Sequence, residues 1–200
     1  MPGFEWIDEA EKNAVSAIFD DGGVLFAHGF EAFRKHYHVR EFEAACQARF
    51  GAANCLAVSS GTAAIKVALK SIGIVPGDEV ITQAFNFVAT IEAILDCGAV
   101  PILANVDETL NMNVSDLESL ITPSTKAIVP VHMLGVSCQM DDILAIGSKR
   151  GIPVIEDACE SVGATFQGKC LGTLADVGAM SFDHGKLVST GEGGLVLSNR

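Results

Sequence analysis

Four short polar segments each follow an apolar run of the kind that forms a buried strand. They are Ser60-Gly61-Thr62, Phe85-Asn86-Phe87, Glu156-Asp157-Ala158 and the stretch from Ser181 to Lys186. In an open α/β sheet, ligands bind outside the carboxyl ends of the strands. We therefore expect these four segments to meet at one edge of a sheet and to form a binding site there.

The first segment has the composition of a phosphate-binding turn. Ser60-Gly61-Thr62 joins a strand to the start of a helix, where free N–H groups and the helix dipole favour an anion. Gly61 lets the backbone approach a ligand closely, and Thr62 adds a hydroxyl group. The same tripeptide also suits an ordinary helix cap, so both interpretations stay open at this point.

The third and fourth segments supply a carboxylate and an amine. Asp157 ends the apolar run 152–155, and a carboxylate buried there needs a cationic or hydrogen-bonding partner. A protonated pyridine nitrogen is one such partner, and a structural or capping role is the alternative. Lys186 follows a strand and has glycines on both sides; a desolvated lysine can act as a nucleophile and a base. An isolated lysine is more often a solvated surface charge, so its assignment depends on its neighbours.

Apolar and amphipathic periodicity predicts the elements that position these segments. Apolar runs predict strands at 56–59, 80–82, 99–103, 127–134, 152–155, 177–182 and 195–197. Helical spacing predicts helices at 64–72, 88–97 and 142–150, and a short helix that a capping box of Ser115 and Glu118 would open. Strands separated by helices of roughly ten residues are typical of a mainly parallel sheet covered on both faces. We expect an α/β fold with three layers, α/β/α.

The chain also suggests a division into two parts. Residues 1–50 are expected to form a helical segment that packs on a large domain of residues 51–200, with a charged helix over 31–50. The last expected strand, 195–197, comes just before Arg200, so we expect a large domain that is cut short and an unpaired sheet edge at that strand.

Composition excludes several classes of protein. The formal net charge is −12, from 25 acidic and 13 basic residues, whereas nucleic-acid binders carry a basic surface. The amino terminus has no signal-peptide pattern, and no apolar run reaches the roughly 20 residues of a membrane helix. The six cysteines form no metal-binding pattern, which favours reduced thiols and no metal. These features predict a cytoplasmic protein without nucleic-acid or membrane partners.

The polar segments belong to a longer ordered set of motifs. The set comprises Ser-Gly-Thr, Phe-Asn-Phe-Val-Ala-Thr, Pro-Val-His, Met-Asp, Glu-Asp-Ala, Ser-Phe-x-x-x-Lys and Gly-Glu-Gly-Gly, between residues 60 and 194. In this order they resemble the DegT/StrS family of sugar aminotransferases, which are fold-type-I enzymes that use pyridoxal 5′-phosphate (PLP). The likeness runs from about Phe50 to Asn199, about three quarters of the chain.

The resemblance implies how the first, second and fourth segments would hold the cofactor. Gly61, Thr62 and Ser181 would bind the phosphate of PLP, and Phe87 matches the aromatic residue that stacks on the pyridine ring. Gln83 stands where the family commonly has proline, which we interpret as a tolerated change in a loop.

The remaining roles concern the reacting end of PLP. By the same resemblance, Asp157 would pair with the pyridine nitrogen and Lys186 would form the internal imine. Glu160 falls near the ring hydroxyl, where the family often has Gln or His. His132 is either a group behind the site or a hydrogen-bonded core histidine.

The activity implied is transfer of an amino group from glutamate or glutamine to a keto-sugar, nucleotide-linked, or to a cyclitol ketone. The resemblance also implies a homodimer when the protein is full length, and a C-terminal small domain that is absent here; we expect the 200-residue piece alone to be inactive. Some relatives are sugar dehydratases with His at the imine position, but the flanking motifs place Lys186 there and not His184. A non-catalytic PLP-binding or regulatory protein is a further alternative. A dinucleotide-binding oxidoreductase is disfavoured because the turn at Ser60 lacks the three-glycine fingerprint.

Overall fold

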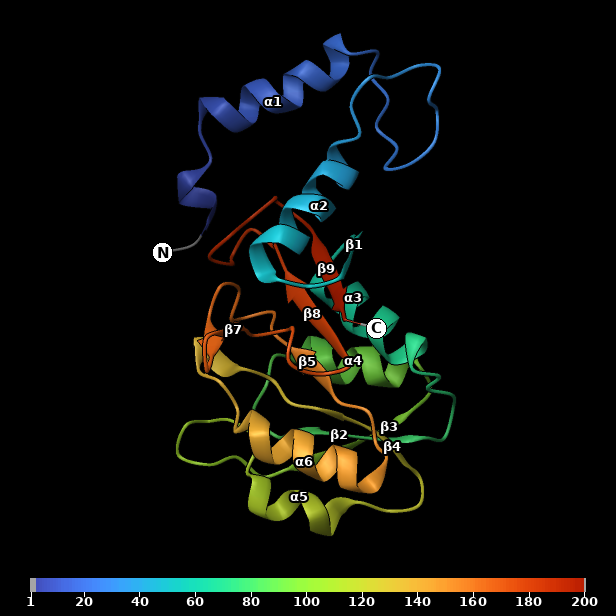
Figure 1. Cartoon of the computed structure of the whole chain (residues 1–200), viewed down its shortest axis with the longest axis vertical. Coiled ribbons are helices and arrows are strands. Elements are labelled where there is room, and N and C mark those ends of the chain that lie inside the picture. The colour runs from blue at the N-terminus through green and yellow to red at the C-terminus, as the bar shows by residue number, and fades with distance from the viewer. Residues whose placement is uncertain (1–2, 200) are drawn as a thin grey trace.

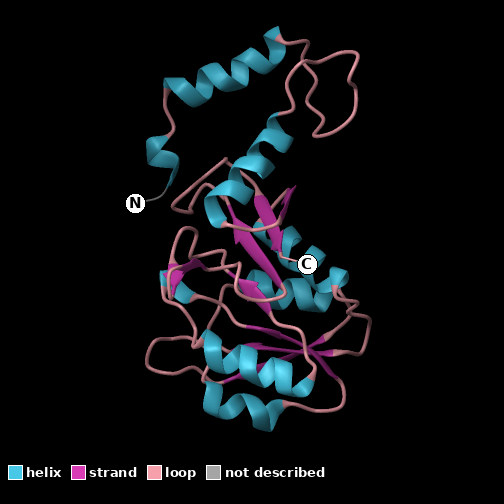
Figure 2. Ribbon diagram, in the orientation of Figure 1, coloured by secondary structure: helices cyan, strands magenta, loops and turns pink. Residues whose placement is uncertain are grey.

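The computed structural model describes residues 3–199 as helices packed on both faces of a β-sheet (Figures 1 and 2). The helical elements are η1 (Gly3–Trp6), α1 (Glu9–Asp20), α2 (His38–Phe50), α3 (Gly61–Ser71), α4 (Val88–Asp96), α5 (Val114–Leu120), η2 (Met133–Gly135) and α6 (Met140–Arg150). The strands are β1 (Asn54–Val58), β2 (Glu79–Gln83), β3 (Val100–Ala104), β4 (Thr125–Val129), β5 (Ile155–Asp157), β6 (Thr165–Phe166), β7 (Lys169–Cys170), β8 (Val177–Ser181) and β9 (Gly194–Ser198). None of the described helices is long and apolar enough to cross a membrane.

The sheet is mixed and mainly parallel, as the sequence predicts. Strands β3-β2-β4 pair in parallel, and β1-β9-β8-β5 form a second ladder in which β9 is antiparallel to both neighbours. Parallel bridges from Ile128 to Val154 and from Val131 to Asp157 join β4 to β5, so the two ladders form a continuous layer. The expectation of an unpaired edge at 195–197 is wrong, because β9 lies between β8 and β1 and is bonded on both sides.

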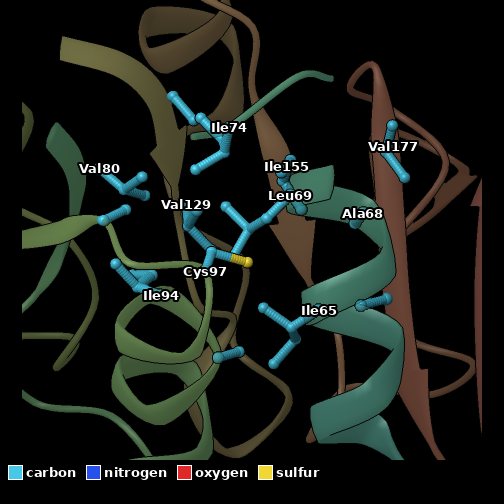
Figure 3. Packing of buried hydrophobic residues seen from close by; sticks show 14 of the residues in the cluster. Ile65, Ala68, Leu69, Ile74, Val80, Ile94, Cys97, Val129, Ile155 and Val177 are labelled. Atoms are coloured by element: carbon cyan, nitrogen blue, oxygen red, sulfur yellow. The ribbon is translucent and has the colours of Figure 1, made fainter. Parts of the chain in front are cut away.

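Helices α3 and α4 cover one face of the sheet. Ile65 and Leu69 of α3 and Ile94 of α4 are buried against Val80 and Val129, in a cluster that also takes in β5, β8 and β9 (Figure 3). Complete burial of an aliphatic side chain of this size contributes about 1.5–3 kcal/mol. This packing fixes the start of α3, and hence the Ser60–Thr62 turn, relative to the ends of β5 and β8.

The opposite face is covered by α5 and α6 over β2 and β4, and by α2 over β8 and β9. Leu117 of α5 and Ile143 of α6 enter one cluster there, and Cys46 of α2 enters another. Phe42 of α2 meets Phe182 edge to face, with ring centroids 5.4 Å apart. Because alternate residues of each central strand enter clusters on opposite faces, the chain has the three expected layers.

The amino-terminal part differs from the expected long helix over 31–50. Helix α2 begins only at His38, and a separate helix, α1, precedes it. Asp8 and Glu11 form a capping box that starts α1, with the Asp8 carboxylate 2.7 Å from the N–H of Ala10. Positive φ angles at Gly22, Gly23, Gly29 and Phe30 interrupt the helical backbone between the two helices. Helix α1 buries none of its residues and lies beyond one end of the sheet (Figure 1).

Two local predictions need correction. Helix α5 is capped by Asn113, whose side-chain oxygen accepts from the N–H of Ser115 at 3.0 Å, so Ser115 lies inside the helix and forms no capping box with Glu118. Strand β4 ends at Val129 and does not reach 134. Residues 133–135 instead form η2, in which Leu134 has a φ of 54°.

Candidate active site

The segments expected at the strand ends meet around a cavity of about 290 Å³. The cavity lies where β5 and β8 end and where α3 and α4 begin. Its walls include every residue that the sequence predicts for the site: Gly61, Thr62, Phe87, Asp157, Glu160, Ser181 and Lys186. The geometry therefore brings together residues that are up to 125 positions apart in the chain, the separation of Gly61 and Lys186.

The turn before α3 leaves backbone donors free at one end of the cavity. The hydroxyl of Ser60 accepts from the N–H of Ala63 at 3.1 Å and so caps the helix. No described residue accepts a hydrogen bond from the N–H of Gly61 or Thr62. A Cβ on Gly61 would lie 2.7 Å from the Cβ of Ser181, so only glycine allows the turn to lie this close to β8. The tripeptide thus caps the helix and still leaves two backbone N–H groups that can donate to a ligand.

Asp157 is buried at the floor of the cavity and is held at both carboxylate oxygens. Oδ2 accepts from the hydroxyl of Thr90 at 2.7 Å, and Oδ1 accepts from the N–H of Cys159 at 3.1 Å. Among the described residues, no lysine, arginine or histidine forms an ion pair with it. The carboxylate is therefore oriented by two neutral donors, while its charge has no cationic partner within this part of the chain.

Lys186 reaches the cavity from the loop between β8 and β9. Its Nζ lies 3.8 Å from a carboxylate oxygen of Glu160 and 5.5 Å from the centre of the Phe87 ring. The Lys186 side chain is 21% exposed, so most of its length is out of water. Phe87 lies at the start of α4 and is 59% exposed, which leaves its ring open to a ligand.

His184 does not take the place of Lys186. Its side chain is 70% exposed, hydrogen-bonds to the carboxylate of Asp183 and does not line the cavity. Asp183, His184 and Glu192 form a group in which the atoms that could bind a metal lie within 4.8 Å of one another. Such groups are common among exposed acidic residues without a metal. No motif in the sequence predicts this group.

His132 proves to be a core histidine. It is fully buried; Nδ1 accepts from the N–H of Cys138 at 3.2 Å, so Nε2 carries the proton and donates to Glu156 at 3.1 Å. Glu156 also accepts from the N–H groups of Gly172, Leu174 and Ala175. Neither side chain lines the cavity, and the pair serves to tie β5 to the segment before β8.

The interpretation of Gln83 as a residue in a tolerant loop is wrong. Gln83 is the last residue of β2 and is fully buried. Its amide donates to the carbonyls of Phe85 and Leu110, and its oxygen accepts from the N–H of Val131 at 3.0 Å. The side chain therefore holds the turn that leads to Phe87 against the end of β4.

Sequence reasoning missed two further contributors. Thr90 belongs to the quoted Phe-Asn-Phe-Val-Ala-Thr motif, but nothing in its spacing indicates that its hydroxyl would reach Asp157, 67 residues away. Cys159 lines the cavity beside Asp157, and burial, followed by the nearby Asp157 carboxylate, raises the pKa of its thiol well above the usual value. The thiol is therefore a neutral neighbour of the carboxylate at physiological pH.

A larger cavity of about 920 Å³ lies at the other end of the sheet, around the first residues of β1 and β8 and the residues just before β5. Its walls are mostly aliphatic, and the single ionisable carboxylate among them, Asp176, accepts from the N–H of Val154 at 2.8 Å. The polar side chains expected to form the site gather at the smaller cavity, at the carboxyl ends of the strands.

Known proteins are similar to this chain in both sequence and fold. Over 160 residues, 80% of this chain, the sequence is 44% identical to GDP-perosamine synthase of Caulobacter vibrioides, of which it covers 43%. It is 38% identical over 198 residues to 3-amino-5-hydroxybenzoate synthase of Amycolatopsis mediterranei, covering 98% of this chain and 49% of that protein. The chain thus spans about half the length of the curated relatives that it matches.

The structure of an aminotransferase from Psychrobacter cryohalolentis superposes with a TM-score of 0.90 at 34% identity, over 97% of this chain and 48% of that one. A similarity of this extent confirms the fold expected from the sequence. The model of the DegT/DnrJ/EryC1/StrS aminotransferase family matches residues 24–200. The chain therefore belongs to the DegT/DnrJ/EryC1/StrS aminotransferase family.

Proposed function

We propose that this chain forms the PLP-binding part of an aminotransferase that moves an amino group from glutamate or glutamine to the ketone of a nucleotide-linked sugar or a cyclitol. The observation that carries the proposal is the convergence of Lys186, Asp157 and the Ser60–Thr62 turn on one cavity. Relatives named for amino-sugar and aminohydroxybenzoate synthesis support the substrate class, a cyclic ketone.

The residues around the cavity fit the chemical groups of PLP. The N–H groups of Gly61 and Thr62, with the hydroxyl of Ser181, offer donors to a phosphate at the start of a helix. The place that a Cβ on Gly61 would fill is already crowded by Ser181 and Cys159, so the turn is pressed against the end of β8. At the other end, the buried carboxylate of Asp157 lacks a cation, which a protonated ring nitrogen would supply.

Each residue then has a distinct part in the proposed reaction. Lys186 would hold the cofactor covalently through Nζ, and once displaced by the amino donor the free Nζ would move a proton at the α-carbon of the donor. Phe87 would stack on the ring, and Asp157 would keep the ring nitrogen protonated. When bound, PLP supplies an electron sink that stabilises negative charge at that carbon.

Glu160 is assigned to the same site through its contact with Lys186. One carboxylate oxygen accepts from the N–H of Leu134 at 3.3 Å, and the other faces Nζ at 3.8 Å. Such a carboxylate would help to hold the Lys186 side chain in the cavity whenever the cofactor is not attached to it. The proposal also includes a homodimer in the full-length protein, in the cytoplasm, without nucleic-acid, membrane or metal partners.

The test is to trap the cofactor on the protein. PLP added to the purified full-length protein should give a yellow species, and borohydride should fix the label on the peptide that contains Lys186. Lys186→Ala should still bind PLP, but without a covalent link. Label recovered on another lysine, or none in the unchanged protein, would show that the assignment is wrong.

A further inference from the structure

The loop that carries Lys186 is held within itself by turns and side-chain hydrogen bonds alone. Residues 182–193, between β8 and β9, form neither helix nor strand. The base of the loop is closed by Phe182, whose N–H donates to Gly193 and whose carbonyl accepts from Thr190. Near the tip, Lys186 donates to the carbonyl of Asp183 at 3.0 Å, while Leu187 is 64% exposed. A contact from outside the loop would add to these bonds in holding Lys186 in place.

One such contact comes from the opposite end of the chain. The N–H of Gly3, in η1, donates to the carbonyl of Lys186 at 2.5 Å. A Cβ on Gly3 would lie 2.8 Å from the carbonyl oxygens of Lys186 and Leu187 and 2.9 Å from the nitrogen of Ser189. All three atoms are backbone atoms, so no side-chain movement could make room for it. Figure 1 shows η1 near this loop.

Gly3 differs in its burial from the residues that follow it in the amino-terminal segment. It is buried, whereas Glu5 and Trp6 of the same turn and every residue of α1 except the half-buried Ile18 are exposed. The ring of Phe4 lies 6.3 Å from that of His184, on the same loop. The contact at Gly3 is thus a local docking of the turn on the 184–189 backbone, and is not a consequence of packing along the whole segment.

We infer that the amino-terminal turn is a positioning element for Lys186. The carbonyl of Lys186 is fixed from one side by Gly3, while its side chain extends from the other side to Glu160 and Phe87. Gly3 would thereby restrict the movement of the Lys186 backbone, and so limit the positions that the amine can take in the cavity. The inference rests on the proposed function only for the task of the amine; the contact itself is independent of that proposal.

The experiment compares Gly3→Val with Glu5→Val, which adds the same branched side chain at an exposed position of the same turn. The first readout is hydrogen exchange of the backbone amides of residues 184–190 without cofactor. The amides of Lys186 and Thr190, which donate within the loop, should exchange about two- to tenfold faster in Gly3→Val, because the loop loses the stabilisation of one backbone hydrogen bond, and Glu5→Val should leave them unchanged. The second readout is the fraction of protein that borohydride traps on Lys186 at limiting PLP, which should fall by a similar factor.

A Lys186→Ala background separates positioning from a general effect on the cavity. There, Gly3→Val should leave the affinity for PLP unchanged, because no amine remains to be positioned. An equal loss of affinity in that background, or unchanged exchange in Gly3→Val, would overturn the inference. If Gly3→Val lowers the thermal unfolding temperature, Gly3→Ala, which adds a single carbon, takes its place with the same criteria. A failure to trap PLP on Lys186 in the unchanged protein would instead count against the proposed function, and the exchange readout would still decide the role of Gly3.

Discussion

Asp157 illustrates how a buried charge can be prepared for a ligand. Its two oxygens are oriented by the Thr90 hydroxyl and the Cys159 N–H, yet these neutral donors leave the negative charge without a cationic partner among the described residues. Burying a carboxylate in this state costs free energy that a cationic ligand would recover. The site is therefore organised before the ligand arrives, which is what efficient electrostatic stabilisation requires.

This arrangement predicts the effect of Asp157→Asn. The amide is nearly isosteric: its oxygen can accept from the Cys159 N–H and its NH2 group can donate to the Thr90 hydroxyl, so the thermal unfolding temperature should change little. The single-turnover rate of the half-reaction with the amino donor, measured on the full-length protein, should fall by orders of magnitude, because a neutral amide cannot hold a proton on the ring nitrogen. Near-normal rates would mean that another group pairs with that nitrogen.

The buried thiols provide a test that involves no ligand. Burial raises the pKa of Cys138 to about 12, from an ordinary value of 9.0. Between these values the unfolded chain has lost the thiol proton while the folded chain keeps it, so this thiol makes folding less stable as the pH rises. The slope is up to about 1.4 kcal/mol per pH unit. Below the unfolded pKa the thiol is neutral in both states and contributes no pH dependence.

Urea unfolding measured from about pH 8 to about pH 11 should therefore show falling stability, and Cys138→Ala should reduce the slope. The other thiols with raised pKa, such as Cys55, should maintain the remaining slope in that variant. Parallel stability curves for the two proteins would show that Cys138 titrates normally in the folded state.

At the level of single residues, the sequence indicated which residues would line the cavity better than it indicated which side chains would bond to one another. The residues expected at the site line one cavity because they follow apolar strands whose carboxyl ends meet at one edge of the sheet. The Thr90–Asp157 and Gln83–Val131 hydrogen bonds were not predicted, because each joins segments whose relative placement depends on the order of strands in the sheet. The cap of α5 was assigned to Ser115 although Asn113 is an equally good capping residue two positions earlier.

At the level of elements, hydrophobic periodicity was sufficient for those that are buried on one or both faces. Strands such as β2 and β8 and helices such as α3 appear close to their expected ranges because burial imposes the pattern directly. Helix α1 has no buried face to impose a pattern, and the two-residue strands β6 and β7 are too short to show one. These were the elements that the sequence did not reveal.

Gly194 connects β9 to the proposed phosphate site and gives a prediction for an element. A Cβ at this position would lie 2.2 Å from the carbonyl oxygen of Ser60 and 2.9 Å from the nitrogen of Gly61, both of which are backbone atoms. Gly194→Ala should therefore push the Ser60–Gly61 turn away from β9. We expect a loss of stability of about 1–3 kcal/mol and a selective loss of affinity for PLP relative to pyridoxal, which lacks the phosphate.

Gly178→Ala is the matched control. Its Cβ would clash equally severely with a backbone carbonyl, that of Gly172, but this contact does not involve the Ser60–Thr62 turn. It should lower stability without changing the ratio of the affinities for PLP and pyridoxal. Equal ratios in the two variants would show that β9 does not shape the phosphate site.

At the level of the whole molecule, the class of fold could be predicted, but the order of the strands could not. Alternation of strands and helices indicates a parallel sheet, yet the insertion of β9 between β1 and β8 depends on pairing between residues about 140 positions apart, such as Leu56 and Val196. That insertion also places Gly194 under the Ser60–Gly61 turn, so the global topology creates the local shape of the site.

The last prediction concerns what the 200-residue chain does by itself. The residues that would hold PLP are present, but the chain spans about half the length of its curated relatives, and Phe87, which would stack on the ring, is 59% exposed. A ring bound there would remain open to water, which weakens the electrostatic interactions on which the reaction depends. We expect residues 1–200 to bind PLP weakly and to show no transamination with glutamate or glutamine and a panel of nucleotide keto-sugars. A protein extended to the length of the relatives, assayed in parallel, should show turnover. Comparable turnover by the two proteins would show that the described cavity is sufficient for catalysis.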